Sequence, residues 1–307
     1  MMPVTALKTR LGTRLLQDEP LARYTAARLG GPADWLYIAR DSDDELADVV
    51  QAAWDADLPV RVLGGGANVL VSDSGLHGLV VINHISRIES GDWHDGRTVS
   101  ATSGTSLTVL ANRCASLGFA GMEWAVSVPG TLGGAVVNNA GAHGGDMAGI
   151  VGDVVVLEAG RGAQLYTAAD MQYDYRHSVL KVREDRRYLV LLATFILPHD
   201  EPEAIKARMA EYTAYRKTTQ PAGASLGSIF KNPPGDYAGR LIEAAGLKGY
   251  RIGNTMVSPV HANFFMNAGQ ASAADYYALI RHVQQVVAEQ SGVQLETEIE
   301  LLGDWPR

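Results

Sequence analysis

Three groups of polar residues in this sequence have side chains that could act on a bound molecule. They are Tyr175-Arg176-His177-Ser178, the string Gly227-Ser228-Ile229-Phe230-Lys231-Asn232-Pro233, and the acidic pair Glu296 and Glu298. A guanidinium can bind a carboxylate through two hydrogen bonds, and a hydroxyl or carboxyl group can pass a proton to a strong base within reach. Each group also has a structural alternative: ion pairing at a strand end for Arg176, a turn or helix N-cap for Ser228, and solvent exposure for the two glutamates.

Glycine accounts for 33 of the 307 residues, and it clusters in loops that could bind phosphate. The first glycine loop is Gly64-Gly65-Gly66-Ala67-Asn68, and the second is Pro129-Gly130-Thr131-Leu132-Gly133-Gly134. Two loops of uncovered backbone N–H groups can cradle one pyrophosphate, although a single loop of this kind is more often a tight turn. A third segment, residues 138–145, contains asparagine amides between glycines. This composition allows close approach to a flat polar ring, and it is also compatible with an ordinary surface loop.

Common nucleotide and metal motifs are missing from the sequence. Val69 stands where a dinucleotide fingerprint needs its third glycine, and neither a G-x-x-x-x-G-K-[ST] string nor a G-x-S-x-G elbow occurs. No two of the eight histidines are three or four residues apart, and one cysteine cannot supply a thiolate set, so we expect no metal site. We expect that cysteine, Cys114, to be a buried structural thiol in a helix.

The composition is that of an ordinary globular protein, with 47% apolar and 20% charged residues. The net charge of -8 argues against a nucleic-acid surface. No apolar stretch approaches the ~18 residues that cross a bilayer, so we expect a cytoplasmic protein without a membrane partner. The oligomeric state stays open, and a monomer is compatible with the sequence.

The elements that must hold the polar groups indicate a mixed α+β chain. Ser42 followed by Glu45 is a capping-box signature ahead of an apolar helical stripe, and strands at 33–39 and 59–63 flank this helix. Further predicted strands are 79–82, 98–101, 154–157, 188–197 and 264–266, and further helices are 107–117, 203–215, 237–245 and 273–290. An alternating final strand at 293–302 would carry both glutamates on one face.

Seven strings occur in an order that marks a known family. They are Arg28-Leu29-Gly30-Gly31-Pro32-Ala33, the first glycine loop, Val128 to Ala135, Asn139-Ala140-Gly141-Ala142, Tyr175 to Ser178, Gly227 to Pro233, and His261-Ala262-Asn263-Phe264. From about Tyr24 to Gly303 the sequence resembles the UDP-N-acetylenolpyruvoylglucosamine reductases, flavoenzymes that make the muramic acid precursor of peptidoglycan. The chain between Arg176 and Ser228 is too short for the tyrosine-bearing loop of the longer subclass, so it resembles the shorter one.

The resemblance implies an α+β fold with an FAD-binding region of the p-cresol methylhydroxylase and vanillyl-alcohol oxidase type. Residues 1–84 and 85–198 would be its two subdomains, with non-covalent FAD between them. Residues 199–307 would be an α+β substrate domain whose last strand returns to the active site. The implied FAD-binding residues are Gly64, Gly65, Gly66, Ala67, Asn68, Pro129, Gly130, Thr131, Gly133, Gly134, Asn139, Ala140 and Gly141.

The resemblance also implies a reaction. NADPH reduces FAD, hydride then passes to C3 of the enolpyruvyl group of UDP-N-acetylglucosamine enolpyruvate, and a proton is added at C2. The implied catalytic residues are Arg176 for the substrate carboxylate, Ser228 for the proton at C2, and Glu298 for holding or protonating the enolic carboxylate. The implied substrate contacts are Tyr175, Lys217, Lys231, Asn232, His261 and Asn263. Thr219 stands where some members have a lysine for the substrate pyrophosphate, so Lys217, Lys231 or Arg216 would replace it.

Two other functions fit the same scaffold. One is a flavin oxidase of the same superfamily, and the other is a nucleotide-binding regulator without enzymatic activity. Oxidases of this superfamily often hold flavin covalently through His or Cys, and Cys114 lies within the predicted helix at 107–117. A regulator would not need Arg176, Ser228 and Glu298 together.

Overall fold

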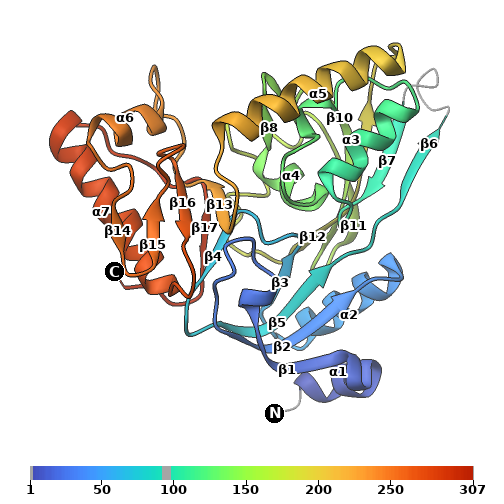
Figure 1. Cartoon of the computed structure of the whole chain (residues 1–307). Coiled ribbons are helices and arrows are strands. Elements are labelled where there is room, and N and C mark those ends of the chain that lie inside the picture. Colours follow the sequence, from blue (N-terminus) through green and yellow to red (C-terminus); the bar gives the residue numbers. More distant parts are fainter. Residues whose placement is uncertain (1–2, 92–97, 307) are drawn as a thin grey trace. The chain divides into compact units, whose positions relative to one another are not determined.

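The computed structural model describes residues 3–91 and 98–306 (Figure 1), and within these residues no helix is both long and apolar enough to cross a membrane. The chain forms two compact units, each assembled from separate stretches of sequence. The first unit contains the stretch up to Leu16, Trp35–Gly64 and Gly78–Tyr215, and the second contains Gln17–Asp34, Gly65–His77 and the stretch from Arg216 onward. These units divide the chain differently from the consecutive segments 1–84, 85–198 and 199–307, and that division remains a prediction.

The N-terminal elements form a four-stranded sheet in the order β1-β2-β5-β3, in which β3 runs parallel to β5. Helix α2 begins as the sequence predicts, because the Glu45 N–H donates to Ser42 Oγ (3.2 Å). Its apolar stripe, including Leu46 and Val50, is buried in a core shared with Val81 of β5. The bounds are α1 Pro3–Leu11, β1 Leu15–Pro20, β2 Pro32–Ala39, α2 Asp43–Asp55, β3 Val60–Leu63 and β5 Leu76–Asn83, with 3₁₀ turns at Gly12–Arg14 and Leu21–Arg23.

A five-stranded antiparallel sheet in the order β11-β10-β12-β7-β6 forms the larger part of the first unit. Leu110 and Cys114 of α3 and Ile205 and Met209 of α5 share a core with Phe195 of β12. Cys114 is therefore a buried helical thiol, as predicted. The bounds are β6 Ile88–Gly91, β7 Thr98–Thr102, α3 Leu107–Ser116, a 3₁₀ turn Glu123–Ala125, α4 Leu132–Asn138, β8 Gly141–Ala142, β9 Gly145–Asp146, β10 Val151–Glu158, β11 Gly162–Thr167, β12 Tyr188–Ile196 and α5 Pro202–Thr219.

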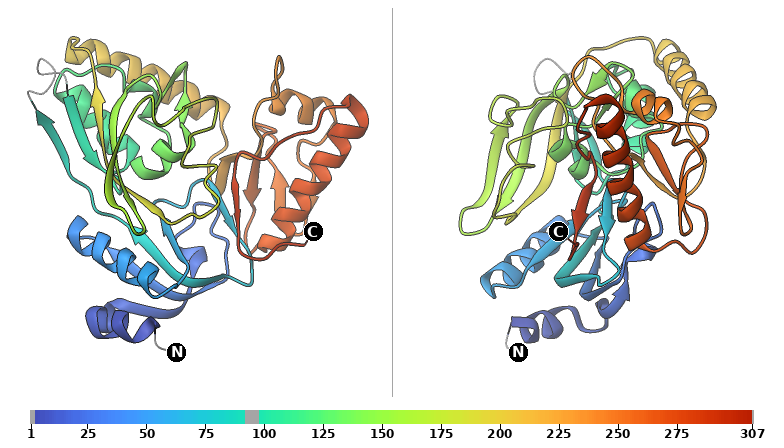
Figure 2. Two further views of the ribbon diagram at one scale, coloured as in Figure 1. Left: turned by 180° about the vertical axis from the view of Figure 1, so that it is seen from behind. Right: turned by 90° about the vertical axis from the view of Figure 1, so that its left-hand side faces the viewer.

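The second unit is built on the antiparallel sheet β13-β16-β15-β14, with the long helix α7 beside it (Figure 2). Tyr276, Leu279, Ile280 and Val283 lie on one stripe of α7 and are all buried in the core of this unit. The Tyr276 hydroxyl donates to Phe265 O of β16 (2.8 Å). The bounds are β13 Ser225–Ser228, α6 Ala238–Ala244, β14 Arg251–Ile252, β15 Thr255–Val257, β16 Phe264–Asn267 and α7 Ala273–Ser291.

The last strand is shorter than predicted. β17 spans only Glu300–Leu302, and it pairs in parallel with β4, Val69–Val71. Residues 293–299 ahead of it form no strand, and among them Thr297 makes only an isolated bridge with Phe230. The prediction of one continuous strand over 293–302 is therefore wrong for residues 293–299, and Glu296 and Glu298 lie outside β17.

Candidate active site

The two glycine loops touch in the first unit. Gly64 directly follows β3, and Thr131 directly precedes α4. A Cβ atom added at Gly64 would lie 1.9 Å from Thr131 Oγ1, so no side chain fits at this position. The rest of the first glycine loop, residues 65–68, belongs to the second unit.

The second glycine loop has fewer available N–H groups than the sequence suggests. The Leu132 N–H donates to Thr105 O (2.8 Å), and the Gly133 N–H donates to Ser103 O (2.8 Å). Gly134 differs, because a Cβ atom there would meet no atom of the described residues within 4 Å beyond its chain neighbours and its own helix backbone. Gly134 is therefore the position in this loop where a bound group can approach the backbone most closely.

Arg176 occupies a tight turn anchored to α4. Asp174 and His177 exchange both backbone hydrogen bonds (3.3 and 3.0 Å), which leaves Tyr175 and Arg176 at the tip. Arg176 has a φ of 53°, a left-handed conformation that is uncommon for residues other than glycine. The buried Ser178 hydroxyl donates to Val137 O (2.6 Å) and fastens the turn to α4. Strained backbone of this kind persists where the surrounding structure holds it, and it clusters at functional sites.

The Arg176 side chain lies against the loop predicted to bind the cofactor. Its Nη1 donates to Asn139 O (3.3 Å), its Nη2 donates to Gly141 O (2.9 Å), and its guanidinium lies 5.2 Å from the Tyr175 ring centre. Asn139 is 2% exposed, and its own amide bonds Asp174 O and the Ala148 N–H (both 2.9 Å). The Asn139 side chain therefore holds the loop together, and the backbone carbonyl of Asn139 orients Arg176.

Buried polar atoms without partners precede the second glycine loop. Trp124 Nε1 and Ser127 Oγ are buried and have no hydrogen-bond partner within residues 3–91 and 98–306. Trp124 also lies against the β8–β9 hairpin, since a Cβ atom at Gly145 would come 2.5 Å from Trp124 Cδ1. Buried polar groups normally have partners, so these two atoms fit a region that receives a polar ligand. Together with Gly134, they fit the FAD expected from the sequence.

An aromatic cluster that the sequence did not reveal joins the β8–β9 hairpin to α5. The His143 ring stacks on Tyr212 with ring centres 4.3 Å apart and meets Tyr215 edge-on at 5.7 Å. His143 has a φ of 53°. The only sequence signal for this cluster is the three-residue spacing of the tyrosines, which places them on one helix face.

In the second unit, backbone pairing sets Glu298 beside the Ser228 segment. Phe230 and Thr297 form an antiparallel bridge, the Lys231 N–H donates to Glu296 O (2.9 Å), and the Glu298 N–H donates to Ile229 O (2.8 Å). Glu298 thus lies across from the residue that follows Ser228. The Asn68 amide donates to Glu298 O (3.3 Å), which adds the first glycine loop to the same cluster.

Several predicted substrate contacts are already engaged within the protein. Lys231 Nζ pairs with the Glu296 carboxylate, and Asn232 Oδ1 accepts the Ala238 N–H (3.1 Å) at the start of α6. His261 Nδ1 accepts the Asn263 N–H (3.2 Å), and burial lowers the pKa of this imidazole.

Asn263, another predicted substrate contact, is 3% exposed, and its side chain bonds only the backbone of Phe230 in the contacts described. Lys217 is exposed near the end of α5, and Tyr175 is also exposed. Burial lowers the pKa of the neighbouring Arg216 guanidinium.

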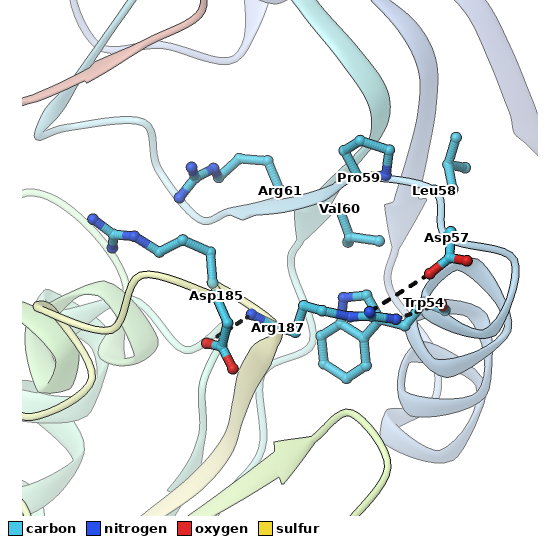
Figure 3. Close-up of a pocket in the computed structure, with 9 residues that line it drawn as sticks. Trp54, Asp57, Leu58, Pro59, Val60, Arg61, Asp185 and Arg187 are labelled. Atoms are coloured by element: carbon cyan, nitrogen blue, oxygen red, sulfur yellow. Dashed lines mark hydrogen bonds and ion pairs between the residues drawn. The ribbon is translucent and has the colours of Figure 1, made fainter.

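A cavity of about 320 Å³ lies elsewhere in the first unit (Figure 3). Its lining comes from the end of α2, the start of β3 and residues 185–187. Arg187 Nη1 lies 3.6 Å from Asp57 Oδ1, and Arg187 Nη2 donates to Trp54 O (2.5 Å). None of these lining residues belongs to the site predicted from the sequence. Val60 lines the cavity, whereas Gly64 follows the opposite end of β3, so the cavity and the glycine loop lie at different ends of this strand.

The chain matches two family models that together cover most of its length. Residues 36–157 match the FAD binding domain, and residues 219–302 match the C-terminal domain of UDP-N-acetylenolpyruvoylglucosamine reductase. The first match confirms the expected cofactor. Among the described residues no three His, Cys, Asp or Glu side chains gather as a metal site requires.

Similar proteins match over nearly their whole length. UDP-N-acetylenolpyruvoylglucosamine reductase of Chloroflexus aggregans is 41% identical, with 96% of this chain and 100% of the relative covered. The protein of that name from Rubrobacter xylanophilus is 42% identical, with 94% and 95% covered. The crystal structure of UDP-N-acetylenolpyruvylglucosamine reductase from Thermus caldophilus superposes with a TM-score of 0.79 at 34% identity, covering 94% of this chain and 98% of that one.

The likeness confirms the predicted α+β fold with an FAD-binding region of the p-cresol methylhydroxylase and vanillyl-alcohol oxidase type, followed by a C-terminal domain. It also confirms the family that the ordered strings indicated, and it identifies the chain as a flavin-dependent oxidoreductase. The chain belongs to the UDP-N-acetylenolpyruvoylglucosamine reductase family.

Proposed function

We propose that this protein reduces UDP-N-acetylglucosamine enolpyruvate to UDP-N-acetylmuramate in the cytoplasm, with NADPH as electron donor, as a step in peptidoglycan precursor synthesis. The observation that carries the proposal is the pairing of residues 229–231 with 296–298, which sets Glu298 beside the Ser228 segment. The full-length similarity to reductases of that name supports it.

Bound FAD would supply hydride transfer. In the first unit Gly64, Thr131 and Gly134 would contact the cofactor. Gly134 has open space beside its backbone, and Trp124 Nε1 and Ser127 Oγ are donors without partners in the described part of the chain. In the second unit the rest of the first glycine loop would contribute Gly65, Gly66, Ala67 and Asn68. Pro129, Gly130, Gly133, Ala140 and Gly141 complete the proposed FAD contacts.

Arg176 would bind the carboxylate of the enolpyruvyl group. Hydride addition at C3 puts negative charge on C2 and into that carboxylate, so a guanidinium that is always charged stabilises the product of this step. The hydrogen bonds to Asn139 O and Gly141 O fix the direction of the side chain before the substrate arrives. Such orientation lowers the entropy lost when the reacting groups come together.

Ser228 would donate the proton to C2. A serine hydroxyl is a weak acid, but it suffices for a strongly basic carbanion within hydrogen-bond reach. Glu298 would hold or protonate the enolic carboxylate. Lys217 and Lys231 would bind the substrate phosphates in place of the lysine that Thr219 replaces, and Tyr175, Asn232 and His261 would add polar contacts.

The two half-reactions test this proposal. In the FAD-loaded protein, NADPH should bleach the flavin absorbance, and UDP-N-acetylglucosamine enolpyruvate should restore it. For Ser228→Ala we expect normal bleaching but restoration slowed by at least ~10²-fold, the lower range for loss of a positioned general acid. Ser225→Ala, in the same strand β13, is the matched control and should restore the absorbance at the wild-type rate. Restoration by oxygen but not by the enolpyruvyl substrate would instead indicate an oxidase.

A further inference from the structure

Asn263 is a buried amide that bonds both backbone groups of a single residue. Its Oδ1 accepts the Phe230 N–H (3.0 Å), and its Nδ2 donates to Phe230 O (2.8 Å). We propose that Asn263 is a positioning residue that fixes the Ser228 and Glu298 segments, and that it does not bind the substrate directly. This inference rests on the proposed function.

The amide takes the place of a neighbouring strand. On one side, the segment 229–231 pairs with 296–298 through Ile229 O and the Lys231 N–H. The N–H and C=O groups of Phe230 point to the other side, as alternate residues of an extended chain do, and there they meet Asn263. The Asn263 backbone carbonyl accepts the Ile229 N–H (2.9 Å). The backbone of Asn263 therefore binds Ile229, and its side chain binds the next residue, Phe230.

These contacts link Asn263 to both implied catalytic positions. Ser228 precedes Ile229, and the Glu298 N–H bonds Ile229 O. Phe230 is 1% exposed, so its backbone groups have little access to water that could replace the amide. Buried polar groups require partners, and loss of the amide would therefore shift the segment. A displacement of about 1 Å in a reacting group can slow chemistry by about 10²-fold.

Asn267 provides a matched control in the same unit. Asn267 is the last residue of β16, whereas Asn263 directly precedes this strand. The Asn267 Nδ2 donates to Ala27 O (2.9 Å), and its Oδ1 accepts the Gly269 N–H (3.0 Å). Like Asn263 it joins separate stretches of the second unit through its amide. In the described contacts its side chain bonds neither residues 228–231 nor 296–298.

The test compares Asn263→Leu and Asn267→Leu in the full-length, FAD-loaded protein by stopped-flow absorbance. Both variants should lose thermal stability, and both should be reduced by NADPH within about 2-fold of the wild-type rate. Only Asn263→Leu should slow reoxidation by the enolpyruvyl substrate, by at least ~10-fold in the limiting rate at saturating substrate. Asn263→Asp keeps the acceptor for the Phe230 N–H and should be intermediate, which provides a second variant if Asn263→Leu does not fold.

A double-mutant cycle separates positioning from direct contact. In the Ser228→Ala background, Asn263→Leu should slow reoxidation further by a smaller factor than it does in the wild-type background, because part of its effect passes through Ser228. Equal slowing by Asn263→Leu and Asn267→Leu, full additivity with Ser228→Ala, or a change only in the substrate concentration for half-saturation would overturn the inference. Failure of the wild-type flavin to be reoxidised by this substrate would overturn the proposed function itself.

Discussion

The guanidinium of Arg176 has a geometric as well as an electrostatic part in the proposed site. It bonds two carbonyl oxygens of the loop 139–141 through separate nitrogen atoms. Lysine keeps the charge but has one nitrogen atom and no planar fork. Arg176→Lys should therefore slow flavin reoxidation by the enolpyruvyl substrate by ~10²-fold, comparable to losing a transition-state hydrogen-bond donor. Stopped-flow absorbance measures this rate, and near-normal reoxidation would count against the assignment.

Cys114 should be chemically silent in the folded protein. It is 0% exposed in α3, and burial raises the pKa of its thiol to about 12, so the reactive thiolate is scarce at neutral pH. We expect a thiol reagent such as dithionitrobenzoate to label it only at the rate of unfolding. Cys114→Ala should leave both half-reaction rates within about 2-fold of wild type. Rapid labelling of the native protein would contradict the buried environment.

The sequence names candidate residues without their partners, and the catalytic roles of these residues remain predictions. Arg176, Ser228 and Glu298 follow from the order of short strings. Asn263 and Asn139 were grouped with ligand contacts, although the described contacts of their amides are with the protein backbone. An amide in a polar string satisfies its hydrogen bonds equally well with a ligand or with a buried backbone, and only tertiary structure decides between them.

Among the secondary elements, those set by local chemistry were predicted best. The capping box fixed the start of α2, and the apolar stripe of α7 gave that helix nearly its full length of Ala273–Ser291. The final strand failed because its pairing partner changes along the chain: residues 296–298 pair with 229–231, and β17 then pairs with β4. Alternation in a sequence carries no information about such a change of partner.

The contact between the two glycine loops gives a prediction at the element scale. Gly64→Ala puts a methyl group 1.9 Å from Thr131 Oγ1, so the loops must separate, and we expect a loss of ~1–3 kcal/mol in apoprotein stability together with weaker FAD binding. Thermal unfolding and titration of FAD fluorescence measure the two effects.

Gly134→Ala is the matched control. Beyond its chain neighbours and its own helix backbone, the added methyl group meets no atom of the described residues within 4 Å, so the stability of the apoprotein should be unchanged or slightly higher. If FAD approaches the backbone here, its affinity should fall in this variant without any loss of stability. An unchanged affinity would remove Gly134 from the proposed FAD contacts, and a fully stable Gly64→Ala protein would contradict the packing of the two loops.

At the scale of the whole molecule, the second unit depends on residues from the first quarter of the chain. Ala27, Leu29 and Leu70 belong to its buried core. β4 supplies the partner of β17, and both carboxylate oxygens of Asp73 accept N–H groups at the start of α7 (2.9 Å each). The resemblance implied a substrate domain over residues 199–307, and that boundary remains a prediction, because contacts with residues 17–34 and 65–77 cannot be seen in the sequence.

This interleaving predicts that the C-terminal stretch cannot fold by itself. A protease site inserted at the exposed turn between Ala222 and Gly223 should yield, after cleavage, two pieces that stay associated and retain cooperative unfolding, because residues 17–34 and 65–77 remain in place.

The isolated piece 223–307 lacks those partners. Loss of one buried leucine contact costs ~1.5–3 kcal/mol, and two leucines plus the helix cap approach the 5–15 kcal/mol that stabilises an ordinary domain. Near-ultraviolet circular dichroism and thermal unfolding of the isolated piece should therefore show no cooperative transition, and a well-folded piece 223–307 would show that the second unit is independent of the N-terminal segments.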